Sequence, residues 1–458
     1  MNRICTAISL ALFGLATLSG ALLAESRQEQ AMAGDWTGRV IFPSTQELIH
    51  LTLEQVEGEW QGEFAAEGGQ AFTDPLVSVE VHGTSLAFEG QRIVRFAGEL
   101  AESGGIVGHI LLGPNRFEAE LHPAGTKAAE SVVAGIEAKR AASFPAPLEA
   151  VATGPGRDRV DLDALEALLA AADEANTHAM AILHDGELVG QWHAGGEVEP
   201  VYTMSLTKPV VAFAVGRLIL DGKLESLDTP VHSFFPQWAD TEHAAITVRH
   251  LMNHSSGLAH AQGQGQIYHA DNAVQFALNS ELLAEPGSQV QYNNNALNLL
   301  AGLVGEAAGR PMDEYLNDTL FEPMGISDWY WARDPAGNPR GMDGLGMTAL
   351  DLARLGQLML NGGEWEGEQL VDADWAAEAV GTRSHEDAGF GLIWMLREEE
   401  GQITAWMHSG SLGQYLVILP QKGLVGVRQI AEYPAYDRER DGFRDFSEKL
   451  TTLVKDEF

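Results

Sequence analysis

A proline- and glycine-rich stretch, residues 143–158, separates two parts of the chain that follow different patterns. Short apolar runs broken by glycines precede it, and longer helical and strand-like patterns follow it. Because proline and glycine interrupt both helices and strands, we interpret this stretch as the second half of a linker. The 458 residues are also long enough for two domains. We therefore predict a β-rich domain over residues 33–122, a linker with a short helix over 123–158, and a second domain over 159–458.

The predicted N-terminal domain consists of short runs, several of them alternating, which is typical of β-strands. The clearest runs are RVIF, LIHLTLEQV, VSVEVHG, SLAFEG and RFEAELH. A G-x-W-x-G pattern occurs twice, at Gly34–Gly38 and at Gly58–Gly62. Two interpretations stay open: hairpin strands that bury a tryptophan, or a small barrel that binds an apolar ligand. No set of polar residues in this region indicates chemistry.

The first 24 residues, MNRICTAISLALFGLATLSGALLA, have the pattern of a secretory signal peptide. Arg3 precedes an apolar run that ends in small residues; a membrane anchor is the alternative, but the run is short for a spanning helix. We predict cleavage near Ala21 or Ala24 and a periplasmic or secreted protein without stable membrane insertion. The only cysteine, Cys5, lies in this segment, so we expect no disulfide and no cysteine-bound metal in the mature chain.

The composition is that of a globular protein with a strongly acidic surface. Apolar residues make up 45% of the chain and charged residues 20%, which is enough for a large core. The formal net charge is -37. Such a surface repels nucleic acid and anionic membranes, so we predict neither as a partner.

The second domain begins with a helix and a strand pair. VDLDALEALLAAADEA (residues 160–175) has helical periodicity, and AMAILHDGELVGQWHAGG (residues 179–196) is typical of a hairpin that turns at Asp185 and Gly186. An apolar helix follows. This order predicts an α+β fold in which helices pack on an antiparallel sheet.

Ser205 and Lys208 lie three positions apart at the start of that apolar helix, TMSLTKPVVAFAVGRLIL. Residues at this spacing share a helix face, so the lysine amine can reach the serine hydroxyl. A serine nucleophile needs a base, and a lysine can be that base only if burial or a nearby charge lowers its pKa. The apolar helix supplies the burial, and its N-terminus favours an oxyanion. By itself the S-x-x-K pattern is weak, and ordinary helix packing is the alternative.

Tyr292 and Asn294 form a Y-x-N pattern in a loop before a helix that we predict from about Ala296. A loop tyrosine beside a lysine can relay a proton to a leaving group. A second copy, Tyr315 and Asn317, lies in an amphipathic helix and is predicted to pack in the core. The loop setting distinguishes the first copy.

The third element is WMHSGSLGQYLVILP, in which His408, Ser409 and Gly410 are predicted to open a β-hairpin at a sheet edge. An edge strand that begins with small residues can lie alongside a substrate. Its backbone N–H groups can then point at a carbonyl oxygen.

Together, and in this order, the three motifs resemble those of the serine β-lactamase and penicillin-binding-protein superfamily, most closely the branch of class C β-lactamases, D,D-peptidases, D-aminopeptidases and related esterases. Ser205–Lys208 matches S-x-x-K, Tyr292–Asn294 matches Y-x-N, and His408–Gly410 stands where that branch has K-T-G or H-x-G. LMNHSSGL and GLGMTALDLARLGQLMLNGG are also similar. The resemblance covers about residues 160–458 and not 1–150. It implies a β-lactamase/transpeptidase-like fold, with an antiparallel sheet flanked by helices and an all-helical subdomain.

By this resemblance, Ser205 is the acylated nucleophile and Lys208 is its base or proton shuttle. Tyr292 is the general acid/base that protonates the leaving group and helps to activate the deacylating water. No metal and no cofactor is implied.

The resemblance also implies a set of substrate-binding residues. Asn294 is expected to orient the substrate amide and the lysine, and the backbone N–H groups of the nucleophile and of Ser411 to form an oxyanion hole. The strand residues His408, Ser409 and Gly410 are expected to line the substrate. A β-lactamase has lysine at the position of His408, and neutral imidazole binds a carboxylate less well than an ammonium does.

These features predict an exported serine hydrolase that acts through an acyl-enzyme on a small-molecule ester, amide or peptide. An esterase or D-amino-acid peptidase is favoured over an efficient β-lactamase. The alternative is a non-catalytic binding or sensor protein of the cell envelope that keeps the fold.

Two other classes of hydrolase are disfavoured. The G-x-S-x-G pattern of α/β-hydrolases is absent. His250 and His254 are four residues apart and His243 is near, but no H-E-x-x-H occurs, so a metal site is not expected. We predict that His254 and Trp406 pack rather than react.

Overall fold

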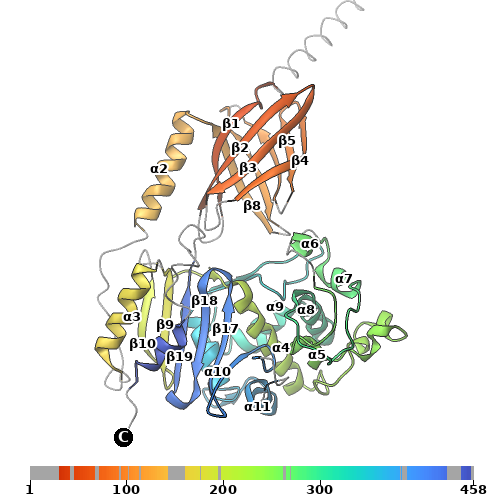
Figure 1. Cartoon of the computed structure of the whole chain (residues 1–458), viewed down its shortest axis with the longest axis vertical. Helices are drawn as coiled ribbons and strands as arrows, with labels where there is room; N and C mark the ends of the chain where they lie inside the picture. The colour runs from red at the N-terminus through yellow and green to blue at the C-terminus, as the bar shows by residue number, and fades with distance from the viewer. Residues whose placement is uncertain are drawn as a thin grey trace, which may run out of the picture. The chain divides into compact units, whose positions relative to one another are not determined.

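The computed structural model describes residues 30–41, 46–67, 72–91, 94–101, 103–112, 115–142, 160–175, 177–193, 198–260, 265–268, 270–381, 383, 389–430 and 445–454. The chain divides into two compact units, Met1–Arg140 and Ala141–Phe458 (Figure 1). The predicted signal peptide with Cys5, and the second half of the predicted linker, lie outside the described residues.

The first unit is a closed antiparallel barrel, in which β1 pairs with both β2 and β8. Its strands are β1 (Gly34–Ile41), β2 (Gln46–Val56), β3 (Glu59–Glu67), β4 (Phe72–His82), β5 (Ser85–Gly90), β6 (Val94–Leu100), β7 (Ile106–Leu112) and β8 (Asn115–Pro123). The predicted β-rich region is thus confirmed. The barrel shape of the second interpretation is what forms, while its binding of an apolar ligand stays a prediction.

Aromatic side chains form part of the core of the barrel. Trp36 of the first G-x-W-x-G pattern is 3% exposed, and its indole N–H donates to the Met32 carbonyl at 3.0 Å. The rings of Phe88 and Phe96 stack at 5.1 Å, and Phe64 lies 6.0 Å from Phe88. These rings belong to the same buried cluster as the aliphatic side chains of the other strands. The predicted short helix follows the barrel as α2 (Lys127–Ala142).

The second unit contains a six-stranded antiparallel sheet in the order β10-β9-β19-β18-β17-β16. Its strands are β9 (Ala179–His184), β10 (Glu187–His193), β16 (Met395–Glu399), β17 (Gln402–Gly410), β18 (Gln414–Leu419) and β19 (Leu424–Gln429). The predicted hairpin turn is confirmed, with positive φ at Asp185 (50°) and Gly186 (82°), as a two-residue turn requires.

Smaller strands and turns complete this unit. A three-stranded sheet joins β11 (Val201–Tyr202), β13 (Leu345–Met347) and β12 (Trp329–Trp331), and a two-stranded one joins β14 (Glu364–Trp365) and β15 (Glu368–Gln369). The short helical turns are η2 (Met204–Leu206), η3 (Val231–Ser233), η4 (Pro236–Trp238), η5 (Glu242–Ala245), η6 (Asn317–Phe321), η7 (Ser411–Gly413) and η8 (Pro420–Lys422).

The helices of this unit belong to two buried clusters, of which the larger contains α4. They are α3 (Leu162–Glu174), α4 (Thr207–Leu220), α5 (Val248–Met252), α6 (Gly265–Tyr268), α7 (Ala273–Leu278), α8 (Asn294–Ala308), α9 (Met312–Leu316), α10 (Ala349–Leu360), α11 (Ala373–Gly381) and α12 (Phe446–Thr451). α10 packs on β9, β18 and β19, and α12 packs on β18. α4 contacts α8, α9 and α11.

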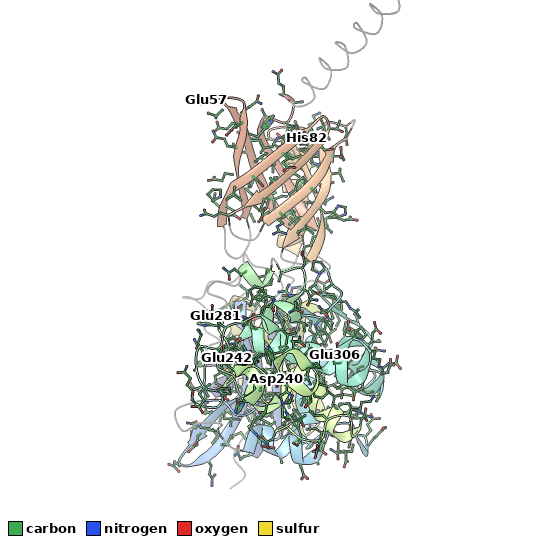
Figure 2. The ribbon with its side chains drawn as sticks, turned by 90° about the vertical axis from the view of Figure 1, so that its right-hand side faces the viewer. Glu57, His82, Asp240, Glu242, Glu281 and Glu306 are labelled. Carbon is green, nitrogen blue, oxygen red and sulfur yellow. The ribbon has the colours of Figure 1, made fainter. Side chains whose placement is uncertain are left out.

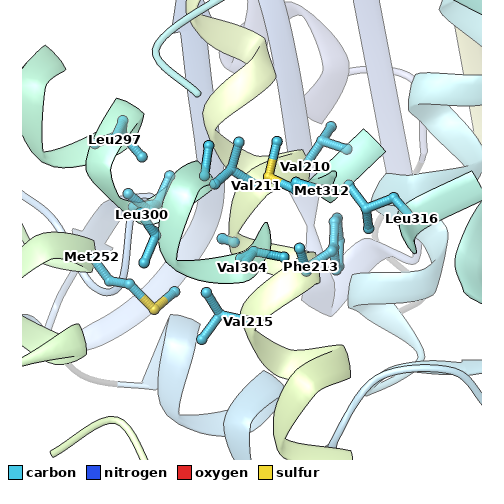
Figure 3. Close-up of a cluster of buried hydrophobic side chains, with 14 of the residues drawn as sticks. Val210, Val211, Phe213, Val215, Met252, Leu297, Leu300, Val304, Met312 and Leu316 are labelled. Atoms are coloured by element: carbon cyan, nitrogen blue, oxygen red, sulfur yellow. The ribbon is translucent and has the colours of Figure 1, made fainter. Parts of the chain in front are cut away.

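α4 is apolar around nearly its whole circumference and is therefore buried on all sides. Val211, Phe213 and Val215 belong to one large cluster with Leu300 and Val304 of α8 (Figure 3). This helix carries Lys208 at its second residue and follows directly after Ser205. The packing of α4 in the core of the second unit thus fixes the position of the candidate nucleophile in the turn before this helix.

The surface of the second unit carries exposed acidic side chains, among them Asp240, Glu242, Glu281 and Glu306 (Figure 2). This agrees with the net charge of -37. Within the part of the chain that the structure describes, no helix is both long and apolar enough to cross a membrane.

Candidate functional site

Ser205 lies in the 3₁₀ turn η2, between β11 and the start of α4. We predicted it at the start of the α-helix itself; the α-helix instead begins two residues later, at Thr207. Met204, the residue before Ser205, has a φ of 52°, in the left-handed region that most residues avoid. Such backbone strain persists only where surrounding contacts fix it.

Two buried threonines supply those contacts. Thr203 donates its hydroxyl to the Leu345 carbonyl at 2.9 Å, and the Leu345 N–H donates to the Thr207 hydroxyl at 3.2 Å. The two hydroxyls lie 3.1 Å apart. They tie the turn that carries Ser205 to strand β13.

Lys208 is fully buried, and its Nζ lies 2.9 Å from the Ser205 hydroxyl oxygen. The amine also donates to the Met342 carbonyl at 2.5 Å. Burial lowers the pKa of Lys208 to about 7; Asp343 opposes this shift and Arg340 reinforces it. The lysine can therefore exist as a neutral base near neutral pH.

The Tyr292 hydroxyl donates to the Ser205 hydroxyl oxygen at 2.9 Å. Its ring centroid lies 4.9 Å from Lys208 Nζ, so the three predicted catalytic side chains do come together. Burial raises the pKa of Tyr292 to about 12; the hydrogen bond to Ser205 opposes this shift and Asp343 adds to it. Tyr292 therefore keeps its proton at neutral pH and is available as a donor.

His254 packs against this tyrosine, with ring centroids 4.8 Å apart. Its Nδ1 accepts the Asn293 N–H at 3.3 Å. Burial, reinforced by Lys208, lowers the pKa of His254 to about 3, so the ring is neutral. These contacts agree with the packing role predicted for His254. The side chain against which it packs is that of Tyr292.

The predicted hairpin at His408–Gly410 forms, but with two corrections. These residues end strand β17 rather than open it, and β16, not β17, is the edge strand. The pairing of β16 with β17 stops at Met395 and Met407, so residues 408–410 pair with β18 alone in the described register. One side of this strand end is thus free of sheet pairing, which suits an added substrate strand.

Gly410 brings the end of β17 against the turn that carries Ser205. A Cβ at Gly410 would lie 2.7 Å from the Thr203 carbonyl oxygen and 3.1 Å from the Met204 Cβ. Ser411 follows at the start of the tight turn η7, in which Leu412 has a φ of 68°. Only glycine fits this close approach without displacing the turn.

His408 and Ser409 face opposite sides of the sheet, because side chains alternate along a strand. Ser409 pairs with Tyr415, whose face packs against α12, whereas His408 pairs with Leu416 of the large core that includes α4. The side chain of Ser409 therefore does not share the face of His408. The expectation that His408, Ser409 and Gly410 line the substrate stays a prediction.

His408 is 2% exposed, and neither ring nitrogen has hydrogen-bond geometry with a described residue. Burial, reinforced by Lys208 and His254, holds its pKa well below the ordinary value, although the Ser409 backbone opposes this. The ring is therefore neutral.

Asn294 is the first residue of α8, capped by Asn293, whose side-chain oxygen accepts the Ala296 N–H at 3.1 Å. The hydrogen bonds that Lys208 makes to described residues go to Ser205 and Met342, so the expected orientation of Lys208 by Asn294 is not seen. Among the described residues, the buried Oδ1 of Asn294 has no hydrogen-bond partner.

The three histidines considered for a metal have other roles. His250 accepts the Thr247 N–H through Nδ1 at 3.3 Å and completes a capping box of α5. The His243 ring stacks on Trp238 at 4.7 Å. Across the described residues, no group of three or more histidine, cysteine, aspartate or glutamate side chains could hold a metal ion.

The sequence pattern did not point to the residues that support Lys208 from the loop before β13. These are Arg340 and Asp343, three residues apart in the glycine-containing segment RGMDG. Opposite charges at this spacing inside a glycine-containing loop were the available signal. The repeated threonine on either side of Ser205 was another.

A family model described as beta-lactamase matches residues 162–443. The chain belongs to the beta-lactamase family. Within the family, it is 32% identical over 144 residues to esterase EstB of Burkholderia gladioli, which covers 27% of this chain and 36% of EstB. It is 24% identical over 271 residues to a provisionally named D-alanyl-D-alanine carboxypeptidase of Escherichia coli K12, covering 46% of this chain and 62% of that protein. The matches thus span less than two thirds of both relatives.

A solved structure from Bacillus anthracis, provisionally named a 6-aminohexanoate-dimer hydrolase, has the same fold. It superimposes with a TM-score of 0.54 at 23% sequence identity, and the match covers 62% of this chain and 80% of the other. The predicted β-lactamase/transpeptidase-like fold of the second unit is confirmed.

Proposed function

We propose that this beta-lactamase family member is an exported serine hydrolase that cleaves small ester or amide substrates through an acyl-enzyme on Ser205. The observation that carries the proposal is a shared contact: Ser205 Oγ lies 2.9 Å from both Lys208 Nζ and the Tyr292 hydroxyl. A nucleophile, a base of lowered pKa and a proton donor therefore meet at one atom.

In the proposed first step, neutral Lys208 takes the proton of Ser205 as its oxygen attacks the substrate carbonyl carbon. The new ammonium is held by the Met342 carbonyl. The tetrahedral oxyanion accepts hydrogen bonds from the backbone N–H groups of Ser205 and Ser411. The closeness of Gly410 to the Ser205 turn supports this pairing of donors.

In the second step, the leaving group takes the proton of Tyr292, and the tyrosine is reprotonated by Lys208. That transfer is supported by the position of both groups, since Lys208 Nζ and the Tyr292 hydroxyl each lie 2.9 Å from Ser205 Oγ. The acyl-enzyme on Ser205 remains. A water then attacks the acyl carbon and gives one proton to the Tyr292–Lys208 pair. The bond between the acyl carbon and Ser205 Oγ breaks, the pair returns that proton to the serine oxygen, and the acid leaves, which restores the starting state. The buried Oδ1 of Asn294, which has no hydrogen-bond partner among the described residues, supports a role in holding a substrate N–H.

The state of His408 supports the choice of substrate. A neutral, buried imidazole suits a neutral hydrogen-bonding group and offers no charge to a carboxylate. We therefore place esters and uncharged amides ahead of β-lactams and of peptides that end in a free carboxylate. The name of the relative EstB, an esterase, supports this order, and the D-alanyl-D-alanine carboxypeptidase name keeps D-peptides as the second choice.

Export and the finer architecture are part of the same proposal. The signal-like residues 1–24 support a periplasmic or secreted location. The packing of α4, α5, α7, α8 and α9 on one another supports a separate helical subdomain.

A substrate panel tests the proposal. We expect wild-type protein to hydrolyse p-nitrophenyl acetate and butyrate faster than a chromogenic cephalosporin or D-Ala-D-Ala peptides. His408→Lys should shift the ratio of kcat/KM towards the carboxylate-bearing substrates by about tenfold, the worth of one charge-assisted hydrogen bond. A wild-type preference for the cephalosporin would contradict the order proposed. Folded protein that neither turns over a substrate nor reacts with a fluorophosphonate would favour the binding-protein alternative.

The rate should depend on pH through Lys208. The lysine must be neutral to accept the proton, so kcat/KM should be low at pH 5, rise as pH passes about 7, and then level off. Tyr292, with a pKa near 12, does not titrate in this range. Initial rates with p-nitrophenyl acetate from pH 5 to 9 measure the profile, after correction for hydrolysis without enzyme. A flat profile would rule out the lysine as the titrating base.

A further inference from the structure

The loop before β13 contains a buried ion pair. Arg340 and Asp343 are 3% and 4% exposed, and the guanidinium donates to the carboxylate at 2.8 Å. The Tyr268 hydroxyl donates to the same carboxylate at 2.5 Å, and its ring lies 4.2 Å from the guanidinium carbon. A buried pair of this kind is held in one geometry, because leaving either charge without its partner is costly.

The backbone of this loop is fixed by further bonds. The Asn298 side-chain oxygen accepts the N–H groups of Gly341 at 3.0 Å and Met342 at 3.1 Å. The Trp331 indole N–H donates to the Arg340 carbonyl at 2.9 Å. A Cβ at Gly341 would lie 2.1 Å from the carbonyl oxygen of Leu297, so the loop lies directly against α8.

These contacts hold the Met342 carbonyl in a position where it accepts a hydrogen bond from Lys208. The Met342 carbonyl, between the two charges in sequence, accepts from Lys208 Nζ. The charges also act on the lysine directly: Asp343 favours its protonated form and Arg340 its neutral form. The two charges of the pair therefore act on the pKa of Lys208 in opposite directions.

We propose that the buried Arg340–Asp343 pair positions Lys208, by fixing the loop whose carbonyl holds the amine and by balancing the charge around it. This inference rests on the proposed function, in which Lys208 is the base. Neither side chain forms part of the reacting set Ser205, Lys208 and Tyr292, so both act through the lysine.

The other titratable groups around Lys208 keep their protonation states in the test. Tyr292 faces it from the segment before α8, His254 from the segment after α5, and His408 from β17. Both histidines are held neutral by burial, and the tyrosine keeps its proton. A shift in the pH profile of a variant in the pair is then assigned to the pair.

The test is the pH dependence of two rates, kcat/KM for p-nitrophenyl acetate and fluorophosphonate labelling of Ser205. The acid limb of each profile is the pH range in which the rate rises as Lys208 loses its proton. Asp343→Asn should move this limb to lower pH by about one unit, because it removes the charge that favours the ammonium. Arg340→Gln should move it to higher pH by about one unit, because it leaves Asp343 unopposed. Shifts in opposite directions distinguish this role from simple loss of structure, which would lower both rates and leave the limb in place.

Two further variants keep the test decisive if a single variant does not fold. The double variant R340Q/D343N removes both buried charges together and should return the limb close to the wild-type pH. Arg340→Lys retains the positive charge and should do the same. Asp351→Asn is the matched control, since Asp351 pairs with Arg354 at the same spacing, 2.7 Å apart, and is not among the charges that act on Lys208.

The inference fails if the folded single variants keep the acid limb of the wild type, or if both move it in the same direction. It also fails if R340Q/D343N or Arg340→Lys moves the limb as far as Asp343→Asn or Arg340→Gln does. Failure of the proposed function looks different. It would appear as wild-type protein that does not label, or as labelling that persists in Ser205→Ala.

Discussion

Replacement of Ser205 by alanine is expected to abolish ester hydrolysis, with a loss of about 10⁴-fold or more in kcat for p-nitrophenyl butyrate. The hydroxyl oxygen is the one atom that both Lys208 and Tyr292 contact, and without it no acyl-enzyme can form. The same variant should also lose covalent labelling by a fluorophosphonate. Steady-state rates and in-gel fluorescence measure the two effects.

The fold should survive this change, because Ser205 is partly exposed and its turn is held by Thr203 and Thr207 rather than by its own side chain. Ser233→Ala, at an exposed serine of the same unit, is the matched control and should keep full activity. The melting temperatures of both variants should stay within a few degrees of wild type. Turnover or labelling retained by folded Ser205→Ala would assign the nucleophile to another residue.

Replacement of Lys208 by methionine is expected to lower kcat by about 10²- to 10⁴-fold, the usual contribution of a positioned general base. Methionine has nearly the same length and fills the buried volume without carrying a proton. Rates with p-nitrophenyl esters isolate the loss of the base, because p-nitrophenolate leaves without needing a proton. Lys223→Met, at an exposed lysine just after α4, is the matched control.

The same substitution should stabilise the folded chain. Burial lowers the pKa of Lys208 from 10.5 to about 7, so the unfolded state binds a proton that the folded state releases between those values. The resulting cost to the folded state grows as the pH falls from 10.5 to 7 and is constant below 7. At pH 7 its removal is worth a few kcal/mol, reduced by about 1–3 kcal/mol for the Met342 carbonyl left without its donor.

Urea unfolding at pH 7 measures this gain. The expected result is a higher midpoint for Lys208→Met than for wild type, together with the loss of activity. A Lys208→Met variant that is both less stable and fully active would contradict the assignment of this lysine as a buried base.

The sequence allowed the central part of this site to be predicted, because local spacing determines it. Ser205 and Lys208 sit three residues apart next to an apolar run, and that arrangement brings the amine to the hydroxyl whether the first turn is α-helical or 3₁₀. The type of that turn depends on the tie from Thr203 to Leu345, 142 residues away, which no local pattern indicates. The prediction of an α-helical start was therefore wrong in detail while the contact was right.

Parts of the site that depend on distant contacts could not be predicted. The Met342 carbonyl lies 134 residues from Lys208 in sequence, and the backbone carbonyl of any residue can accept such a bond. The end of β17 was misplaced for a similar reason: whether a strand lies at the edge depends on β16, whose short run LREE carries charges and no clear alternation.

The barrel illustrates a further limit. β7 (IVGHILL) and β6 (VRFAGEL) are interrupted by Gly108 and Gly98, so their patterns were missed, although both strands pair in full. The closure of β1 on β8 joins residues at opposite ends of the unit and leaves no signal in either strand alone. Alternation predicted strands but not their number or their closure.

The burial of α4 on all sides has a consequence for how this protein can change over evolutionary time. Because Lys208 stands on this packed helix and Ser205 lies in the turn just before it, almost any substitution in the core beside them would disturb folding and chemistry together. Adaptation to a new substrate must therefore come from partly exposed positions around Tyr292 and the strand end at Gly410, where a changed side chain alters fit without loosening the centre. Heat should likewise displace Lys208 only when the core around α4 melts, since this lysine is fully buried.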